Sequence, residues 1–128
     1  PPMACAAGLA VLDVIREERL CERAEEIGEL IKSRLLGLRR TNSLSCIGDV
    51  RGPGAMIALE LVKGGDADQP DADLTRALVV DCAKEGLILL SCGIRSNVIR
   101  FLVPLTASDE LVNEGLDVLE RNLVRLAG

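Results

Sequence analysis

Apolar residues recur at helical spacing in four segments of the chain. They follow one another in steps of three and four over residues 2–18 and 20–38, and again over residues 74–85 and 109–126. Polar and charged residues fill the intervening positions, so each segment presents one apolar stripe. The pattern predicts four amphipathic helices. The second pattern is interrupted at residues 42–43.

Capping residues support the ends of the later helices. Asp71 or Asp73 can accept hydrogen bonds from the first turn of the third helix, and Gly86 follows its last turn. Thr106 and Asp109 have the spacing of a capping box before the fourth helix.

Four shorter segments have the composition of β-strands, at residues 46–51, 55–62, 87–90 and 98–103. The first two are separated by Gly52-Pro53-Gly54, which is typical of a tight turn. The last two are joined by a polar turn and predict a hairpin. The order helix-helix-strand-strand-helix-strand-strand-helix predicts an α/β chain of the α+β two-layer kind. In such a fold helices pack on a small, mostly antiparallel sheet of about four strands.

Composition narrows the possible functions. The 128 residues provide one domain, and their net charge of -5 with a single aromatic residue argues against a nucleic-acid surface. No apolar run approaches the roughly 20 residues of a membrane span, and nothing in these residues resembles a signal peptide. Because the helical pattern starts within two residues of Pro1, we expect a piece of a longer polypeptide.

The cysteines do not form a metal-binding pattern. Five are present, never closer than ten residues apart, and the chain contains no histidine. We therefore expect no metal site, and reduced thiols in the core of a cytoplasmic protein.

Arg100 is the main candidate for function. It interrupts the apolar strand 97–105, and a guanidinium is costly to bury without a partner. Alternation places Val98, Arg100 and Leu102 on one face of that strand. Two interpretations stay open: a strand-end arginine that reaches solvent or pairs with a helix glutamate, and a binding group whose natural ligand is a carboxylate.

Other polar features have simpler explanations. The turn at Gly52-Pro53-Gly54 lacks the spacing of a phosphate-binding loop. Glu60 fits the solvent face of a strand, and the aspartates of residues 64–73 lack the glycine and distal glutamate of a calcium loop. No nucleophile lies next to a plausible base, so the chain alone does not have the features of a complete enzyme.

Five stretches of sequence nevertheless resemble a known family. They are PMACAA at 2–7, LCERA at 20–24, GDVRGPGAMIALEL at 48–61, GLILLSCG at 86–93 and NVIRFLVPLT at 97–106. In this order they resemble the C-terminal part of class III aminotransferases, which are pyridoxal-phosphate enzymes with the fold of aspartate aminotransferase. The last two stretches are most similar to members that act on 4-aminobutyrate. Members that act on ornithine, acetylornithine or β-alanine share much of the pattern.

The resemblance implies that residues 1–128 are the C-terminal small domain of a transaminase. Such an enzyme moves the amino group of 4-aminobutyrate to 2-oxoglutarate and yields succinate semialdehyde and glutamate. Pyridoxal 5'-phosphate would be held by a large domain upstream of Pro1, so this chain would bind no cofactor and be inactive alone.

For individual residues, the resemblance implies that Arg100 binds the α-carboxylate of glutamate or 2-oxoglutarate. It assigns no catalytic, cofactor-binding or metal-binding residue to this chain. The implied partners are small amino and oxo acids, the enzyme's own large domain, and further copies in a dimer or a dimer of dimers. The alternative is a stand-alone, non-catalytic ligand-binding α/β module that dimerises through its first helix.

Overall fold

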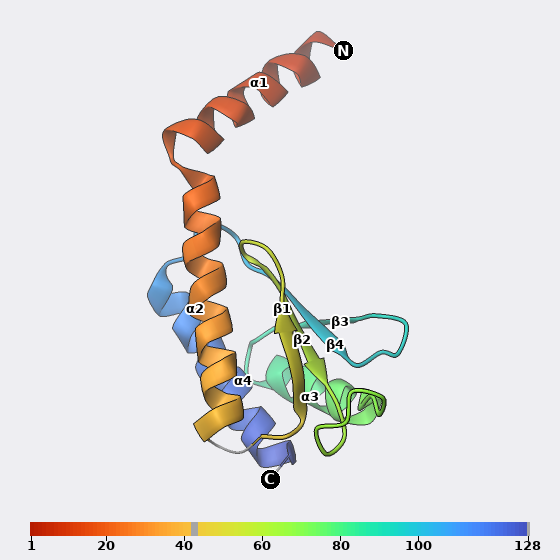
Figure 1. Cartoon of the computed structure of the whole chain (residues 1–128). Helices are drawn as coiled ribbons and strands as arrows, with labels where there is room; N and C mark the ends of the chain where they lie inside the picture. Colours follow the sequence, from red (N-terminus) through yellow and green to blue (C-terminus); the bar gives the residue numbers. More distant parts are fainter. Residues whose placement is uncertain (42–43, 128) are drawn as a thin grey trace.

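The computed structural model describes residues 1–41 and 44–127, so the break expected at residues 42–43 lies outside the described part. The described residues form helices and strands in the predicted order (Figure 1). These elements are α1 (Pro2–Glu17), α2 (Leu20–Thr41), β1 (Ile47–Arg51), β2 (Met56–Leu61), α3 (Ala72–Lys84), β3 (Leu90–Cys92), β4 (Val98–Leu102) and α4 (Asp109–Ala127).

The strands form one antiparallel sheet in the order β1-β2-β4-β3. β1 with β2 and β3 with β4 are hairpins, and β2 pairs with β4 in the middle of the sheet. Helices α2 and α3 lie against the sheet, and α4 packs against both of them (Figure 1). The predicted α+β two-layer sandwich is therefore confirmed.

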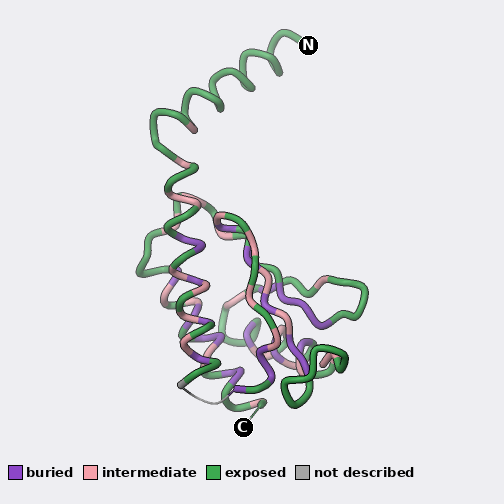
Figure 2. Tube along the Cα trace, viewed as in Figure 1, coloured by how far each residue is buried: buried purple, intermediate pink, exposed green. Residues whose placement is uncertain are grey.

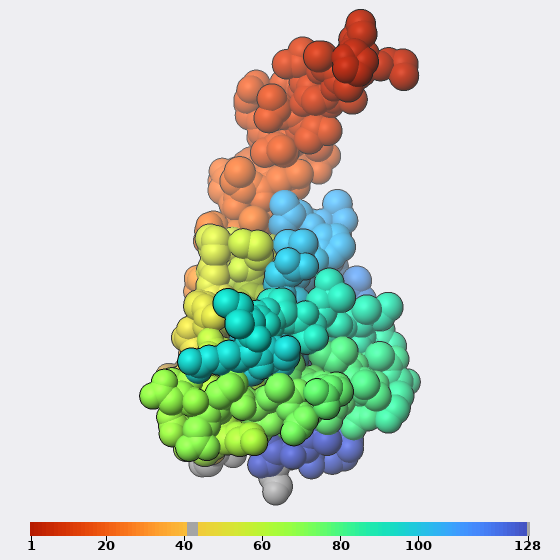
Figure 3. Space-filling model, turned by 90° about the vertical axis from the view of Figure 1, so that its right-hand side faces the viewer, coloured from red at the N-terminus to blue at the C-terminus, as the bar shows by residue number. Residues whose placement is uncertain are grey.

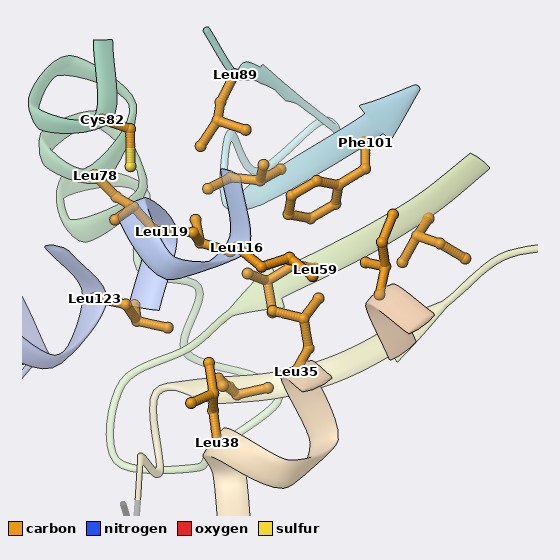
Figure 4. Packing of buried hydrophobic residues seen from close by; sticks show 14 of the residues in the cluster. Leu35, Leu38, Leu59, Leu78, Cys82, Leu89, Phe101, Leu116, Leu119 and Leu123 are labelled. Atoms are coloured by element: carbon orange, nitrogen blue, oxygen red, sulfur yellow. The ribbon is translucent and has the colours of Figure 1, made fainter. Parts of the chain in front are cut away.

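The hydrophobic core lies between the sheet and these three helices. Alternation along β2 and β4 directs Ile57, Leu59, Ile99 and Phe101 toward the helices, where each is buried. Figure 4 shows Leu59 and Phe101 converging with leucines of the helices, including Leu116 of α4. Along β2 and β4, the residues that alternate with these four point away from the helices. We call this side of the sheet its outer face.

The third strand begins later than predicted. Pairing with β4 starts where Leu90 lies opposite Arg100, whereas the sequence pattern placed the strand at residues 87–90. Leu89 is buried and Leu87 partly buried against the helical core, so these apolar residues belong to the approach to the strand.

The two predicted N-terminal caps have different outcomes. The Asp71 carboxylate accepts a hydrogen bond from the backbone N–H of Leu74 at 3.0 Å, as expected for an N-cap. The predicted capping box at Thr106 is wrong. The hydroxyl of Ser108, not that of Thr106, accepts the hydrogen bond from the backbone N–H of Leu111 in the first turn of α4, at 3.3 Å.

Helix α2 lies exceptionally close to the turn between β1 and β2. A Cβ atom on the buried Gly28 would lie 2.0 Å from the carbonyl oxygen of Gly54. Gly54 has a φ of 49°, in the left-handed region, and the N–H of Met56 donates to the Pro53 carbonyl at 3.2 Å. The tight turn predicted from the sequence is confirmed, and α2 holds it in place.

Helix α1 extends away from the rest of the chain. It has no buried residue and contacts only α2 among the helices and strands described (Figures 2 and 3). Met3, Leu9 and Val11 are more than half exposed. Within the described chain, no helix has both the length and the apolar character needed to cross a bilayer.

Candidate functional site

Arg100 lies at the centre of the outer face. In the sheet it stands opposite Ala58 of β2 on one side and Leu90 of β3 on the other. Its side chain is exposed, because the helices cover the opposite face. No acidic side chain among the described residues pairs with its guanidinium. The first interpretation from the sequence was an arginine that reaches solvent or pairs with a helix glutamate. That pairing is absent from residues 1–41 and 44–127, whereas the exposed side chain does reach solvent.

Apolar side chains surround this charge. Met56, Leu90 and Leu102 share the outer face with Arg100 and are 49%, 56% and 66% exposed. Large apolar side chains gathered around one arginine are a common arrangement in binding sites, where they exclude water and strengthen the charge's interaction with a ligand.

An open groove of about 600 Å³ runs beside Arg100. Its walls are residues 85–90, 100–104 and 106–107, and α4 supplies residues between Leu111 and Val118. Arg23 of α2 fixes one wall, since it donates to the carbonyl oxygen of Ala107 at 2.7 Å and pairs with Asp109 at 2.8 Å. The hydrogen bond to Asp109 raises the pKa of the Arg23 guanidinium.

A second arginine on the outer face is already paired. Nη1 of Arg51 lies 2.7 Å from Oδ2 of Asp49 and 2.7 Å from Oε2 of Glu60. These hydrogen bonds raise the pKa of Arg51, the bond to Asp49 contributing most. On the other side of Glu60, Nδ2 of the buried Asn97 donates to the carbonyl oxygen of Leu61 at 2.9 Å. The sheet thus presents one arginine held in a network and one that is open to a ligand.

The lysines of this chain do not converge on the groove. Lys32 pairs with Glu29 on α2, Lys84 pairs with Asp81 on α3, and Lys63 is exposed after β2. None of them lines the groove. Among the described residues, this groove therefore has no lysine of the kind that a pyridoxal-phosphate site needs at the cofactor's carbonyl carbon.

Two of the five thiols are buried and unsuited to chemistry. Burial raises the pKa of Cys82 to about 11 and also raises the pKa of Cys46, so both stay protonated at neutral pH. All five cysteines are free, but only these two belong to the core. Cys5 and Cys21 are exposed, so the expectation that the cysteines are core residues is wrong for them.

Comparison with known proteins identifies the family. The model of the class-III aminotransferases matches residues 1–123. The chain therefore belongs to the class-III aminotransferase family, as the sequence motifs indicated, and enzymes of this family depend on pyridoxal phosphate.

Individual relatives agree with this assignment. The chain is 48% identical to 5-aminovalerate aminotransferase DavT of Pseudomonas aeruginosa, across 98% of this chain and 29% of that protein. It is 46% identical to 4-aminobutyrate aminotransferase GabT of Escherichia coli, across 94% of this chain and 28% of that protein. A Bacillus anthracis aminotransferase superposes with a TM-score of 0.84 at 27% identity, over 98% of this chain and 28% of the other. The chain thus spans less than a third of the length of these relatives.

Sequence reasoning singled out Arg100 but missed its surroundings. Arg51 and Asn97 appeared only within motifs, and Glu60 was expected simply to face solvent. Their association depends on the register of β1 and β2, which places Arg51 and Glu60 on the same face, and on Asn97 just before β4. The alternation of β1 and β2 could have placed Arg51 and Glu60 on one face, but not the pairing between them.

Proposed function

We propose that residues 1–128 are the C-terminal small domain of a class III transaminase that moves an amino group from an ω-amino acid to 2-oxoglutarate. Its own large domain would hold pyridoxal phosphate, which supplies the electron sink for the amino transfer. This chain's contribution is to bind and orient the oxo acid. Assembly into a dimer or a dimer of dimers in the cytoplasm is part of the same proposal.

The exposed guanidinium of Arg100 carries the proposal. An arginine offers two parallel N–H donors to a carboxylate, which fixes both the position and the plane of that group. The apolar side chains of Met56, Leu90 and Leu102 limit its access to water once a ligand or a second domain covers the outer face. A dicarboxylate held at one end in this way would present its oxo carbon in a defined direction.

The names of the relatives support an ω-amino acid of four or five carbons as donor. One relative is named for 5-aminovalerate and several for 4-aminobutyrate, each across more than nine-tenths of this chain. We propose 4-aminobutyrate, with succinate semialdehyde and glutamate as products. Comparing kcat/KM of the full-length enzyme for 4-aminobutyrate, 5-aminovalerate, ornithine, acetylornithine and β-alanine tests this choice. A higher value for any of the other four donors would contradict it.

Arg100→Lys tests the role of the arginine. In the full-length enzyme the substitution should raise KM for 2-oxoglutarate about tenfold or more, because it removes a charge-assisted bidentate contact worth ~1.5 to 3 kcal/mol. Steady-state kinetics with varied 2-oxoglutarate measure the effect. Arg76→Lys is the matched control, because Arg76 lies on α3 in an exposed ion pair with Asp73. Unchanged 2-oxoglutarate kinetics in Arg100→Lys would contradict the assignment of Arg100 as the group that binds the oxo acid.

A further inference from the structure

We propose that Arg51 and Asn97 are positioning residues that keep the carboxylate of Glu60 away from Arg100. The Arg100 guanidinium then stays available to the carboxylate of the oxo acid. This inference rests on the proposed function of Arg100 and adds two residues that act on it through a third.

Glu60 is the acidic residue best placed to compete for Arg100. In the β2–β4 pair Glu60 stands opposite Val98, and Ala58 stands opposite Arg100. Glu60 and Arg100 are therefore diagonal neighbours on the outer face, at a spacing of about 7–8 Å that long side chains can bridge. An ion pair between them would place a protein carboxylate where the substrate's carboxylate has to bind.

The structure shows Glu60 engaged elsewhere. Its Oε2 accepts the hydrogen bond from Nη1 of Arg51 at 2.7 Å, and Nδ2 of Asn97 lies 3.5 Å from its Oε1. Asp49 anchors the same Nη1 of Arg51 at 2.7 Å. Asn97 is 2% exposed and is itself fixed by the carbonyl oxygen of Leu61. Both carboxylate oxygens of Glu60 are thus directed toward partners other than Arg100.

Removal of Arg51 would reverse this arrangement. Without its partner, the carboxylate of Glu60 can turn to Arg100, the cation diagonal to it on the same face. An oxo acid would then have to displace Glu60 before it could bind. We therefore expect weaker binding of the oxo acid. The rate at which the complex with bound oxo acid reacts should change little.

The test is the variant Arg51→Ala in the full-length enzyme that contains this chain. KM for 2-oxoglutarate should rise roughly threefold to tenfold. A change of this size corresponds to the free energy of one ion pair that is partly shielded from solvent. The inhibition constant of glutarate, an unreactive dicarboxylate, should rise in parallel. By contrast, kcat at saturating 2-oxoglutarate should stay within about twofold. Arg76→Ala, which also removes one arginine of an exposed ion pair, is the control.

A double-variant cycle separates positioning from a structural role. In a Glu60→Gln background, Arg51→Ala should change KM by less than about twofold, because no carboxylate is left to compete. A merely structural loss would persist in that background. If Arg51→Ala lowers the midpoint of thermal unfolding, Arg51→Gln is used in its place, both in the parent background and in the Glu60→Gln background.

The outcomes distinguish this inference from the proposed function. Unchanged KM in Arg51→Ala, or a rise that persists with Glu60→Gln, overturns the positioning role while Arg100→Lys still tests the clamp. If Arg100→Lys leaves KM unchanged, the proposed function itself fails.

Discussion

Ala58 is the residue directly across the β2–β4 pair from Arg100, and its small size leaves the guanidinium open. Side chains opposite one another in an antiparallel pair have Cβ atoms about 4.5–5.5 Å apart. A larger side chain at position 58 would therefore lie over the stem of Arg100. Arg51 flanks Ala58 from β1, so the space has a charged residue on either side.

Ala58→Leu should therefore weaken binding of the oxo acid. We expect KM for 2-oxoglutarate in the full-length enzyme to rise about fivefold, because the leucine covers the approach to Arg100. Ala58→Ser, of similar size, should stay within about twofold of the parent. Ala83→Leu adds the same volume on an exposed part of α3 and is the control. A leucine variant with the KM of the parent would show that position 58 does not limit access.

At the level of elements, the position of the β1–β2 turn depends on Gly28. The Cβ of an alanine there would overlap the carbonyl oxygen of Gly54 at 2.0 Å, so α2 and the turn would have to separate. Gly28→Ala should lower the free energy of unfolding by about 2 kcal/mol or more, as for an overpacked core. Gly37→Ala in the same helix meets no atom within 4 Å and should be neutral or stabilising, by up to about 1 kcal/mol. Urea unfolding followed by far-UV circular dichroism compares the two, and equal effects would contradict the role of the close contact.

The elements also show how far the sequence could be interpreted. Periodicity located all four helices and three of the strands to within about two residues at each start, because each has one apolar face. All of these elements except α1 bury that face against a single core. The apolar pattern placed the start of β3 too early. Leu87 and Leu89 pack against the core near α4 and do not pair with β4. Ser108 replaced Thr106 as the cap, because the exact start of a helix depends on the tertiary contacts of its first turn. The partners of Glu60 could not be predicted, because they depend on pairing across separate strands.

For the whole molecule, the described chain leaves two apolar surfaces uncovered. One is helix α1, and the other is the outer face around Arg100. Exposed apolar patches of this kind mark contacts with another domain or chain. We propose that the enzyme's own large domain covers the outer face and completes the site.

This division of labour predicts that the isolated chain forms no specific adduct with pyridoxal phosphate. Its three lysines lie apart, on α2, after β2 and on α3, and none lines the groove, so no lysine is held beside the groove to react with the cofactor. Borohydride reduction after incubation with equimolar pyridoxal phosphate should therefore leave most of the chain at its original mass. The full-length enzyme under the same conditions should carry one label per subunit, on a lysine outside residues 1–128. Peptide mapping by mass spectrometry locates the label in each case. Stoichiometric labelling of Lys32, Lys63 or Lys84 would show that this chain holds cofactor by itself, and would place the site on a surface that the fold leaves open to solvent.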